Sequence, residues 1–147
     1  MKNKNYLYGL LLYGFIAGFT SPVSAEIRQC DKEFISSDDS HIVYMGRISR
    51  SIPHIVRFTY PGVSILANFE GTSLQMKAKP GSGAFMVEVD DELPYRINFA
   101  ENDSIQTLAE GLPEGTHRVR IMYAIEGYEL KPAFKGFYLD KGCRLAE

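Results

Sequence analysis

Three histidines are the side chains best suited to acid–base or metal chemistry in this 147-residue chain: His41, His54 and His117. They are dispersed, and no two of them have the H-x-x-H or H-E-x-x-H spacing of a metal site. His117 belongs to the alternating stretch 117–121, beside Arg118, where a solvated or edge position accounts for it. We therefore expect no catalytic histidine and no metal site.

Two other segments have the composition of an ion or phosphate site but not the required spacing. The acidic turn Asp90-Asp91-Glu92 clusters carboxylates, which hard cations bind, but it lacks the D-x-[DN]-x-[DN]-G order of a calcium loop. The glycine-rich residues 79–83 are not followed by G-K-[ST], so they do not form a phosphate loop. Both segments are typical of turns between strands, and we expect no cofactor.

Tyrosines are the residues with which a β domain could bind a sugar, because aromatic rings stack on sugar faces. The chain has nine tyrosines and no tryptophan, and ordinary packing is the favoured explanation for each tyrosine. The weak candidates for carbohydrate binding are Tyr44, Tyr60, Tyr95, Tyr123 and Tyr128.

Short alternating segments must position these side chains, since polar and apolar residues repeat with period two. Turn residues such as Pro61-Gly62 and residues 113–115 separate them at intervals of about ten residues. No segment has the apolar spacing of a helix. We expect an all-β jelly-roll sandwich of the galactose-binding-like kind, a single domain of about eight or nine strands. The predicted strands are His41–Arg47, Ile55–Tyr60, Val63–Phe69, Ser73–Lys79, Ala84–Val89, Tyr95–Phe99, Ile105–Ala109, Thr116–Ala124 and Phe134–Leu139.

The first 25 residues have the order of a cleaved signal peptide. Lys2 and Lys4 precede an uncharged apolar run that is too short to span a bilayer, and small residues lead to Ala25. Residues 26–40 are then an N-terminal extension and 41–147 the sandwich domain. We expect an exported protein, periplasmic or secreted, without a membrane segment after cleavage. Removing two lysines from a chain of net charge −2 leaves −4, with dispersed basic residues, so nucleic acid is not an expected partner.

Two cysteines, Cys30 and Cys143, lie near the two ends of the predicted mature chain. In an oxidising compartment they allow one pairing, and the first and last strands of many sandwiches are neighbours. We favour a disulfide, which could stabilise the fold by up to about 4–5 kcal/mol. Two unpaired thiols are the alternative.

A series of segments resembles the N-terminal jelly-roll domain of carbohydrate esterase family 2. Phe-Glu-Gly-Thr-Ser followed by Gly-Phe-x-Leu-Asp-x-Gly makes the resemblance fairly specific, whereas G-L-x-x-G-x-H-x-V alone occurs in many sandwiches. The matching segments, in the order of the family, are 43–47, 58–65, 69–73, 108–119 and 134–142.

The resemblance implies a two-domain esterase that removes acetyl groups from polysaccharides such as xylan and glucomannan. In that family the catalytic Ser and His lie in a C-terminal SGNH domain, whereas this chain stops about where the linker to that domain would begin. Asn102-Asp103-Ser104-Ile105 is similar to the Gly-Asp-Ser block of such hydrolases, but Asn102 replaces the glycine whose amide helps to bind the oxyanion. No catalytic residue can be assigned, and we expect no enzyme activity from this chain alone.

Three functions remain open at this point. The first is an exported accessory or carbohydrate-binding module, whose partner is a plant-type polysaccharide or a separate esterase catalytic domain. The second is the N-terminal fragment of an acetylxylan esterase that lacks its catalytic domain. The third is a structural or protein-docking domain of the cell envelope.

Overall fold

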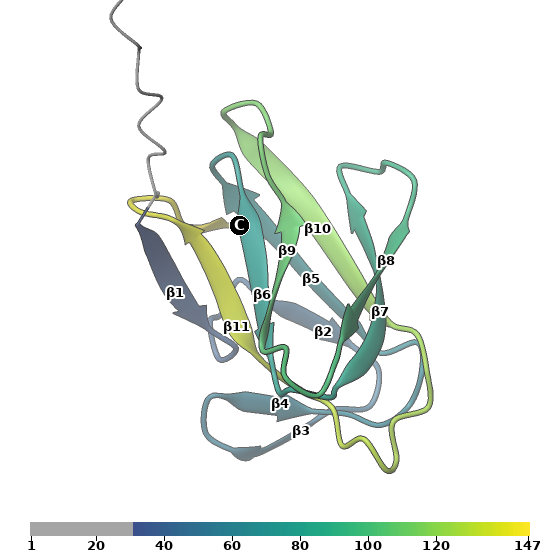
Figure 1. The fold of residues 1–147 in the computed structure, drawn as a ribbon. Helices are drawn as coiled ribbons and strands as arrows, with labels where there is room; N and C mark the ends of the chain where they lie inside the picture. The colour runs from purple at the N-terminus through teal and green to yellow at the C-terminus, as the bar shows by residue number, and fades with distance from the viewer. Residues whose placement is uncertain (1–30) are drawn as a thin grey trace, which may run out of the picture.

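Alternating strands pair into two antiparallel sheets that face each other (Figure 1). The computed structural model describes residues 31–147, and within them no helix is long and apolar enough to cross a membrane. The first sheet has the order β3-β4-β11-β6-β9, with β1 also beside β11. Its strands are β1 (Lys32–Ser36), β3 (Ser49–Ile52), β4 (Ile55–Arg57), β6 (Leu74–Ala78), β9 (Ile105–Ala109) and β11 (Ala133–Asp140).

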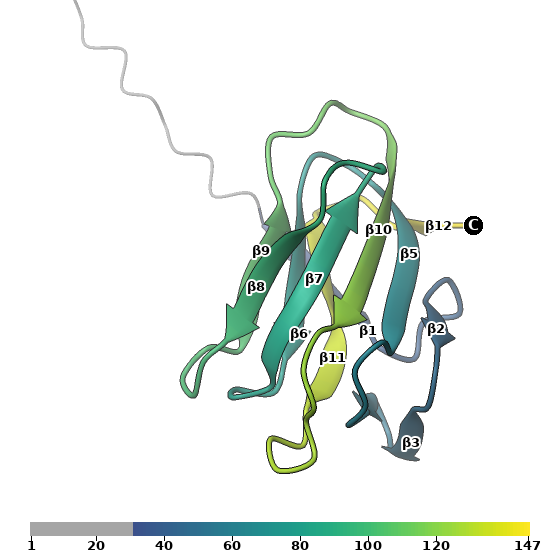
Figure 2. The ribbon, with the colours of Figure 1, turned by 90° about the vertical axis from the view of Figure 1, so that its right-hand side faces the viewer.

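The second sheet has the order β12-β5-β10-β7-β8, with β2 also beside β5. Figure 2 shows β5, β10, β7 and β8 in front of β6 and β11. Its strands are β2 (Val43–Met45), β5 (Ser64–Glu70), β7 (Gly83–Val89), β8 (Tyr95–Phe99), β10 (Thr116–Tyr123) and β12 (Leu145–Ala146).

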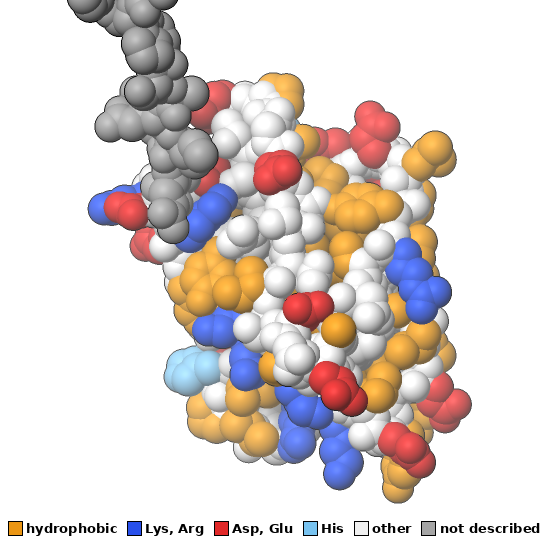
Figure 3. Space-filling view, viewed as in Figure 1, with side chains coloured by type: hydrophobic (Ala, Val, Ile, Leu, Met, Phe, Trp, Pro, Cys, Tyr) orange, Lys and Arg blue, Asp and Glu red, His pale blue; other side chains and the backbone are white. Residues whose placement is uncertain are grey.

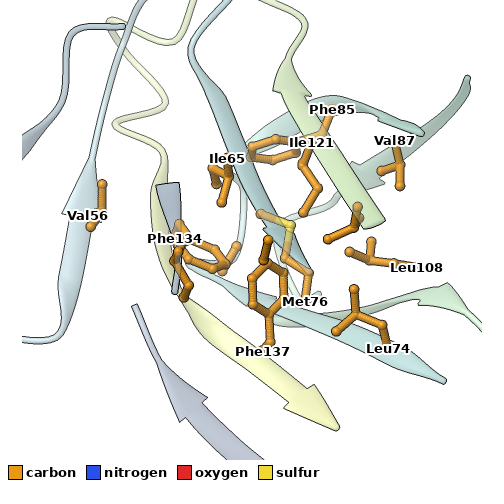
Figure 4. Packing of buried hydrophobic residues seen from close by; sticks show 14 of the residues in the cluster. Val56, Ile65, Leu74, Met76, Phe85, Val87, Leu108, Ile121, Phe134 and Phe137 are labelled. Atoms are coloured by element: carbon orange, nitrogen blue, oxygen red, sulfur yellow. The ribbon is translucent and has the colours of Figure 1, made fainter. Parts of the chain in front are cut away.

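The core lies between the two sheets because each central strand has one apolar side. In β10, Val119 and Ile121 are fully buried, whereas Arg118 and Arg120 face solvent. Side chains of both sheets meet in this layer (Figure 4), among them Phe134, Met76 and Phe137 of the first sheet and Ile65, Ile121 and Phe85 of the second. Burying large apolar side chains in this way is the main favourable contribution to the stability of a sandwich.

Strand β1 reaches its place because residue 136 of β11 is a glycine. Gly136 has a φ of +142°, and a Cβ added there would lie 2.1 Å from the carbonyl oxygen of Ile35. The register of β11 against β6 shifts between Phe134 and Gly136, which forms a bulge at this point. A side chain at 136 would therefore push β1 away from the sheet.

The expected all-β sandwich is confirmed, with 12 strands instead of eight or nine. The prediction missed β1, β3 and β12, and it made the second strand too long, since β2 covers only Val43–Met45. Strand β3 is exposed at all four residues and β12 has two, so neither carries an alternating pattern. Strand β1 lies in the stretch predicted as an N-terminal extension, yet it pairs with β11 along its whole length.

Candidate functional site

One groove combines exposed aromatic rings with hydrogen-bond donors. It lies between the β3–β4 hairpin and the loop of residues 124–132 that joins β10 to β11; both are at the lower end of the molecule in Figure 1. Two adjoining hollows of about 660 and 300 Å³ share Ser49, Arg57, Phe58 and Thr59. We call their combined surface the tyrosine–arginine groove; its other lining residues are Arg47, Ile48, Tyr60, Tyr128, Glu129, Lys131 and Pro132.

Backbone hydrogen bonds hold the two walls of the groove together. The amide of Gly127 donates to the carbonyl of Thr59 at 2.8 Å, and the amide of Phe58 donates to the carbonyl of Pro132 at 3.5 Å. A Cβ on Gly127 would lie 2.3 Å from the hydroxyl of Tyr123, so only glycine lets the loop pack this closely. The next residue, Tyr128, is 77% exposed. The loop is thus anchored while its tyrosine stays available to a ligand.

The aromatic floor of the groove is continuous with the core. Phe58 is buried and packs edge-on against Phe85 and Tyr123, with ring centroids 6.1 and 5.1 Å apart. This packing fixes the strand segment that carries Arg57 and Thr59 on either side of Phe58. The polar groups of the groove therefore stand on a rigid support, which lowers the entropy lost on binding.

The five candidate tyrosines have different surroundings. Only Tyr60 and Tyr128, which are 53% and 77% exposed, line the groove. Tyr123 lies in the core, and the hydroxyl of Tyr44 donates to the carbonyl of Ser37 at 2.8 Å. Tyr95 is partly exposed, and its hydroxyl donates to the carbonyl of Leu108. Burial raises the pKa of Tyr44, Tyr95 and Tyr123, which is the effect of packing expected for most tyrosines of a sandwich.

A second aromatic surface lies on the outer face of the first sheet. The rings of Phe34 and Tyr138 are 5.1 Å apart, and the ammonium of Lys77 lies 5.0 and 5.5 Å from their centroids. The Lys77 ammonium also donates to the Tyr138 hydroxyl at 3.2 Å. We call these three residues the outer-face cluster. The sequence did not predict this cluster, because Phe34 belongs to β1, a strand that was not expected.

His117 is not solvated, which corrects the expectation for this residue. The alternation that turns Arg118 outward turns His117 inward, and it is 8% exposed. Its Nδ1–H donates to Asp90 at 2.6 Å, and its Nε2–H donates to the carbonyl of Pro113 at 2.8 Å. Because both partners are acceptors, the two hydrogen bonds favour the doubly protonated ring. The Pro113 carbonyl, opposed by burial and helped by the Asp90 carboxylate, raises the pKa of His117.

The acidic turn is occupied by contacts within the protein. Asp90 also accepts a hydrogen bond from the amide of Arg118 at 2.9 Å, and Asp91 forms an ion pair with the Arg118 side chain. Burial would raise the pKa of Asp90, but the Arg118 amide and the His117 ring outweigh it and hold that pKa below its usual value. Within residues 31–147, no three His, Cys, Asp or Glu side chains are grouped as metal ligands.

Ser104 and His117 lie at opposite ends of β6. The carbonyl of Ser104 accepts from the amide of Ala78, the last residue of β6, whereas His117 is opposite Phe69, just before the turn that leads into β6. Five strand residues span roughly 15 Å. These two side chains therefore do not form a nucleophile–base pair.

Cys143 is partly buried, and its thiol has a raised pKa because of burial and the nearby Asp140, Glu114 and Glu70 carboxylates. It is consequently a weak nucleophile. Cys30 lies outside the described residues, as does the predicted leader 1–25. The first described residue, Asp31, accepts a hydrogen bond through its carbonyl from the Lys141 amide at 2.9 Å.

The family model "Carbohydrate esterase 2 N-terminal" matches residues 44–147, which include both walls of the groove and most of the core. The chain belongs to this family. In sequence, an acetylxylan esterase / glucomannan deacetylase of Cellvibrio japonicus is 31% identical over 87 residues, which are 59% of this chain and 24% of that protein.

Two solved structures share the fold. A family two carbohydrate esterase from Cellvibrio japonicus matches with a TM-score of 0.65 and 23% identity, over 80% of this chain and 34% of its own. A family two carbohydrate esterase from Clostridium thermocellum in complex with cellohexaose matches with a TM-score of 0.60 and 28% identity, over 72% of this chain and 33% of its own. The chain thus spans a quarter to a third of the length of these relatives.

Proposed function

We propose that residues 31–147 form a non-catalytic, polysaccharide-binding domain that serves an esterase catalytic domain, in an exported protein. The observation that carries this proposal is the exposed Tyr128, held by an anchored loop above a groove with guanidinium, ammonium and hydroxyl donors. A sugar ring stacks on such a tyrosine while its hydroxyls bond to polar groups at the edge. The relatives named as an acetylxylan esterase / glucomannan deacetylase and as a complex with cellohexaose support this class of ligand.

The non-catalytic part of the proposal rests on Ser104, from the segment similar to the Gly-Asp-Ser block, and on His117, the buried histidine of the described chain. Both nitrogens of His117 are within hydrogen-bond distance of acceptors of the protein itself, so neither is directed at a substrate. Ser104 is at the other end of β6. We expect no hydrolysis of an aryl acetate above the buffer rate by residues 26–147, and activity that is lost in Ser104→Ala would overturn this part.

Binding can be measured by affinity electrophoresis and calorimetry with acetylated xylan, glucomannan and cellohexaose. Tyr128→Ala should weaken binding by about tenfold, because losing the stacking of a sugar on the ring should cost about 1.4 kcal/mol. Tyr138→Ala in the outer-face cluster is the matched control and should leave affinity unchanged. Retention on none of these glycans would refute glycan binding and favour a docking role in the envelope.

The N-terminal part of an esterase is a second candidate, favoured by the share of the relatives that the chain spans. Reading the coding DNA beyond the codon for Glu147 tests it. A Gly-Asp-Ser block within about 30 codons would place the catalytic domain on the same polypeptide, and its absence from that stretch would favour a separately encoded one.

A further inference from the structure

The groove collects basic side chains that lack acidic partners. Most exposed arginines elsewhere are paired: Arg118 with Asp91, Arg120 with Glu88 and Arg144 with Glu70. Among residues 31–147, by contrast, no carboxylate lies within 4.0 Å of the charged groups of Arg47 or Arg57.

Two more basic residues at this end are unpaired in the same sense. Lys131 lines the groove, and the guanidinium of Arg50 lies 5.0 Å from the centroid of the Tyr44 ring. Within the described chain, neither Lys131 nor Arg50 forms an ion pair. Figure 3 shows several Lys and Arg side chains at this end of the molecule, with Asp and Glu side chains beside them. Basic side chains without an acidic partner attract anionic ligands.

The two halves of the groove differ in charge. The half lined by Arg47, Arg57 and Tyr60 has no acidic residue among its lining residues. The half with Tyr128 and Lys131 includes Glu129, and Glu126 lies beside Tyr128. A ligand carboxylate is therefore favoured next to Arg47 and Arg57, and uncharged sugar rings are favoured next to Tyr128.

The chemistry of Arg57 suits a carboxylate that is held on a sugar. Arg57 belongs to β4 and lies opposite Ser49 of β3 and opposite Ala133 of β11, so its strand is paired on both sides. A guanidinium on a fixed strand can form two parallel hydrogen bonds to a carboxylate, which an ammonium cannot. Tyr60 lines the same half of the groove as Arg57, so its ring is available to the sugar that carries the carboxylate.

We propose that the tyrosine–arginine groove selects polysaccharides that bear carboxylate groups, as uronic acid residues do, with the carboxylate bound by Arg57 and Arg47. This rests on the proposed function, and it adds the class of glycan. The net negative charge of the chain, −2, argues against nucleic acid as the anion.

The decisive comparison uses one polysaccharide in two forms: a xylan carrying glucuronic acid, and the same xylan after chemical reduction of its carboxyl groups to alcohols. The wild-type domain should bind the acidic form at least about tenfold more tightly at low salt, and the preference should shrink as salt rises. Equal affinity for both forms would overturn the proposal while leaving glycan binding intact. Binding to neither form, nor to neutral glucomannan, would refute the proposed function itself.

Variants of Arg57 separate the contribution of its charge from that of the rest of the groove. Arg57→Ala should abolish the preference for the acidic form by lowering affinity for that form more than affinity for the reduced form, whereas Arg57→Lys should keep part of the preference because the charge remains. Arg120→Ala, on the outer face of the other sheet, is the matched control and should change neither affinity. Since Arg57 is exposed, these variants should unfold at the wild-type urea concentration. A preference that persists in Arg57→Ala combined with Arg47→Ala would place the anion site elsewhere and overturn the assignment.

Discussion

The pair of His117 and Asp90 should stabilise the fold in a defined pH range, and Asp90→Asn isolates its charge. Asn has the shape of Asp and tolerates the left-handed backbone at this position, where φ is +51°. A hydrogen bond to a charged group contributes about 1.5–3 kcal/mol. Because the Asp90 side chain is 39% exposed and therefore screened, we expect a loss of about 1–2 kcal/mol in the free energy of unfolding.

The direction of the two pKa shifts sets the pH range. The raised pKa of His117 gives stability that is present below its ordinary value of 6.5 and lost as pH rises through the folded value. The lowered pKa of Asp90 gives stability that is present above its ordinary value of 3.8 and lost as pH falls through the folded value. The loss in Asp90→Asn should thus be greatest near pH 5–6, between the ordinary values of the two groups, and should shrink as pH rises through the folded pKa of His117.

Urea unfolding followed by tyrosine fluorescence can measure this, since the chain has nine tyrosines and no tryptophan. Asp91→Asn is the matched control: its φ is +63°, its side chain is 70% exposed, and its ion pair with Arg118 is a surface pair that should contribute less than about 0.5 kcal/mol. A loss in Asp90→Asn that is equal near pH 5.5 and pH 8.5, or an NMR titration that places the pKa of His117 below 6.5, would refute the reasoning.

The other predictions concern one glycine, the cysteines and the leader. Gly136→Ala should lower the free energy of unfolding by at least about 3 kcal/mol, because the added Cβ would clash with β1. Gly142 is also at positive φ but has nothing within 4 Å of an added Cβ, so Gly142→Ala should lower it by about 1 kcal/mol. Urea midpoints compare the two variants, and equal losses would contradict the clash. If Cys30 and Cys143 form the predicted disulfide, the chain purified from an oxidising compartment should have no reactive thiol after denaturation; two titratable thiols would exclude the disulfide. Mass spectrometry of the exported protein should show cleavage after Ala25, and an intact leader would disprove it.

Much of the sandwich could be predicted from alternation, because the central strands have one buried and one solvated face. The stretch from Leu74 to Ala78 and the stretch from Thr116 to Tyr123 both alternate along their length, and both are strands. Edge strands carry less signal, since β3 is exposed throughout and β1 depends on a glycine in a distant strand. Their positions follow from pairing with β4 and β11, which a local pattern does not contain.

The candidate site was predicted only in part for a similar reason. Tyr60 and Tyr128 were among the five tyrosines predicted as candidates, because the residue type alone indicates a ring that could stack on a sugar. Arg57 and Lys131 were not, because they are more than 70 residues apart in the chain and meet only where β4 pairs with β11. A long-range strand pairing thus creates a charge arrangement that no short motif encodes.

The position of His117 shows how a conspicuous residue can serve the fold instead of the chemistry. Its ring joins the β7–β8 turn, through Asp90, to the segment before β10, through the carbonyl of Pro113. Its ring centroid also lies 5.4 Å from that of the buried Phe69. The tyrosine–arginine groove is built from other elements, the β3–β4 hairpin and the loop 124–132. Changes at His117 should therefore alter stability and its pH dependence but not ligand preference. Changes at Arg57 should alter ligand preference but not stability.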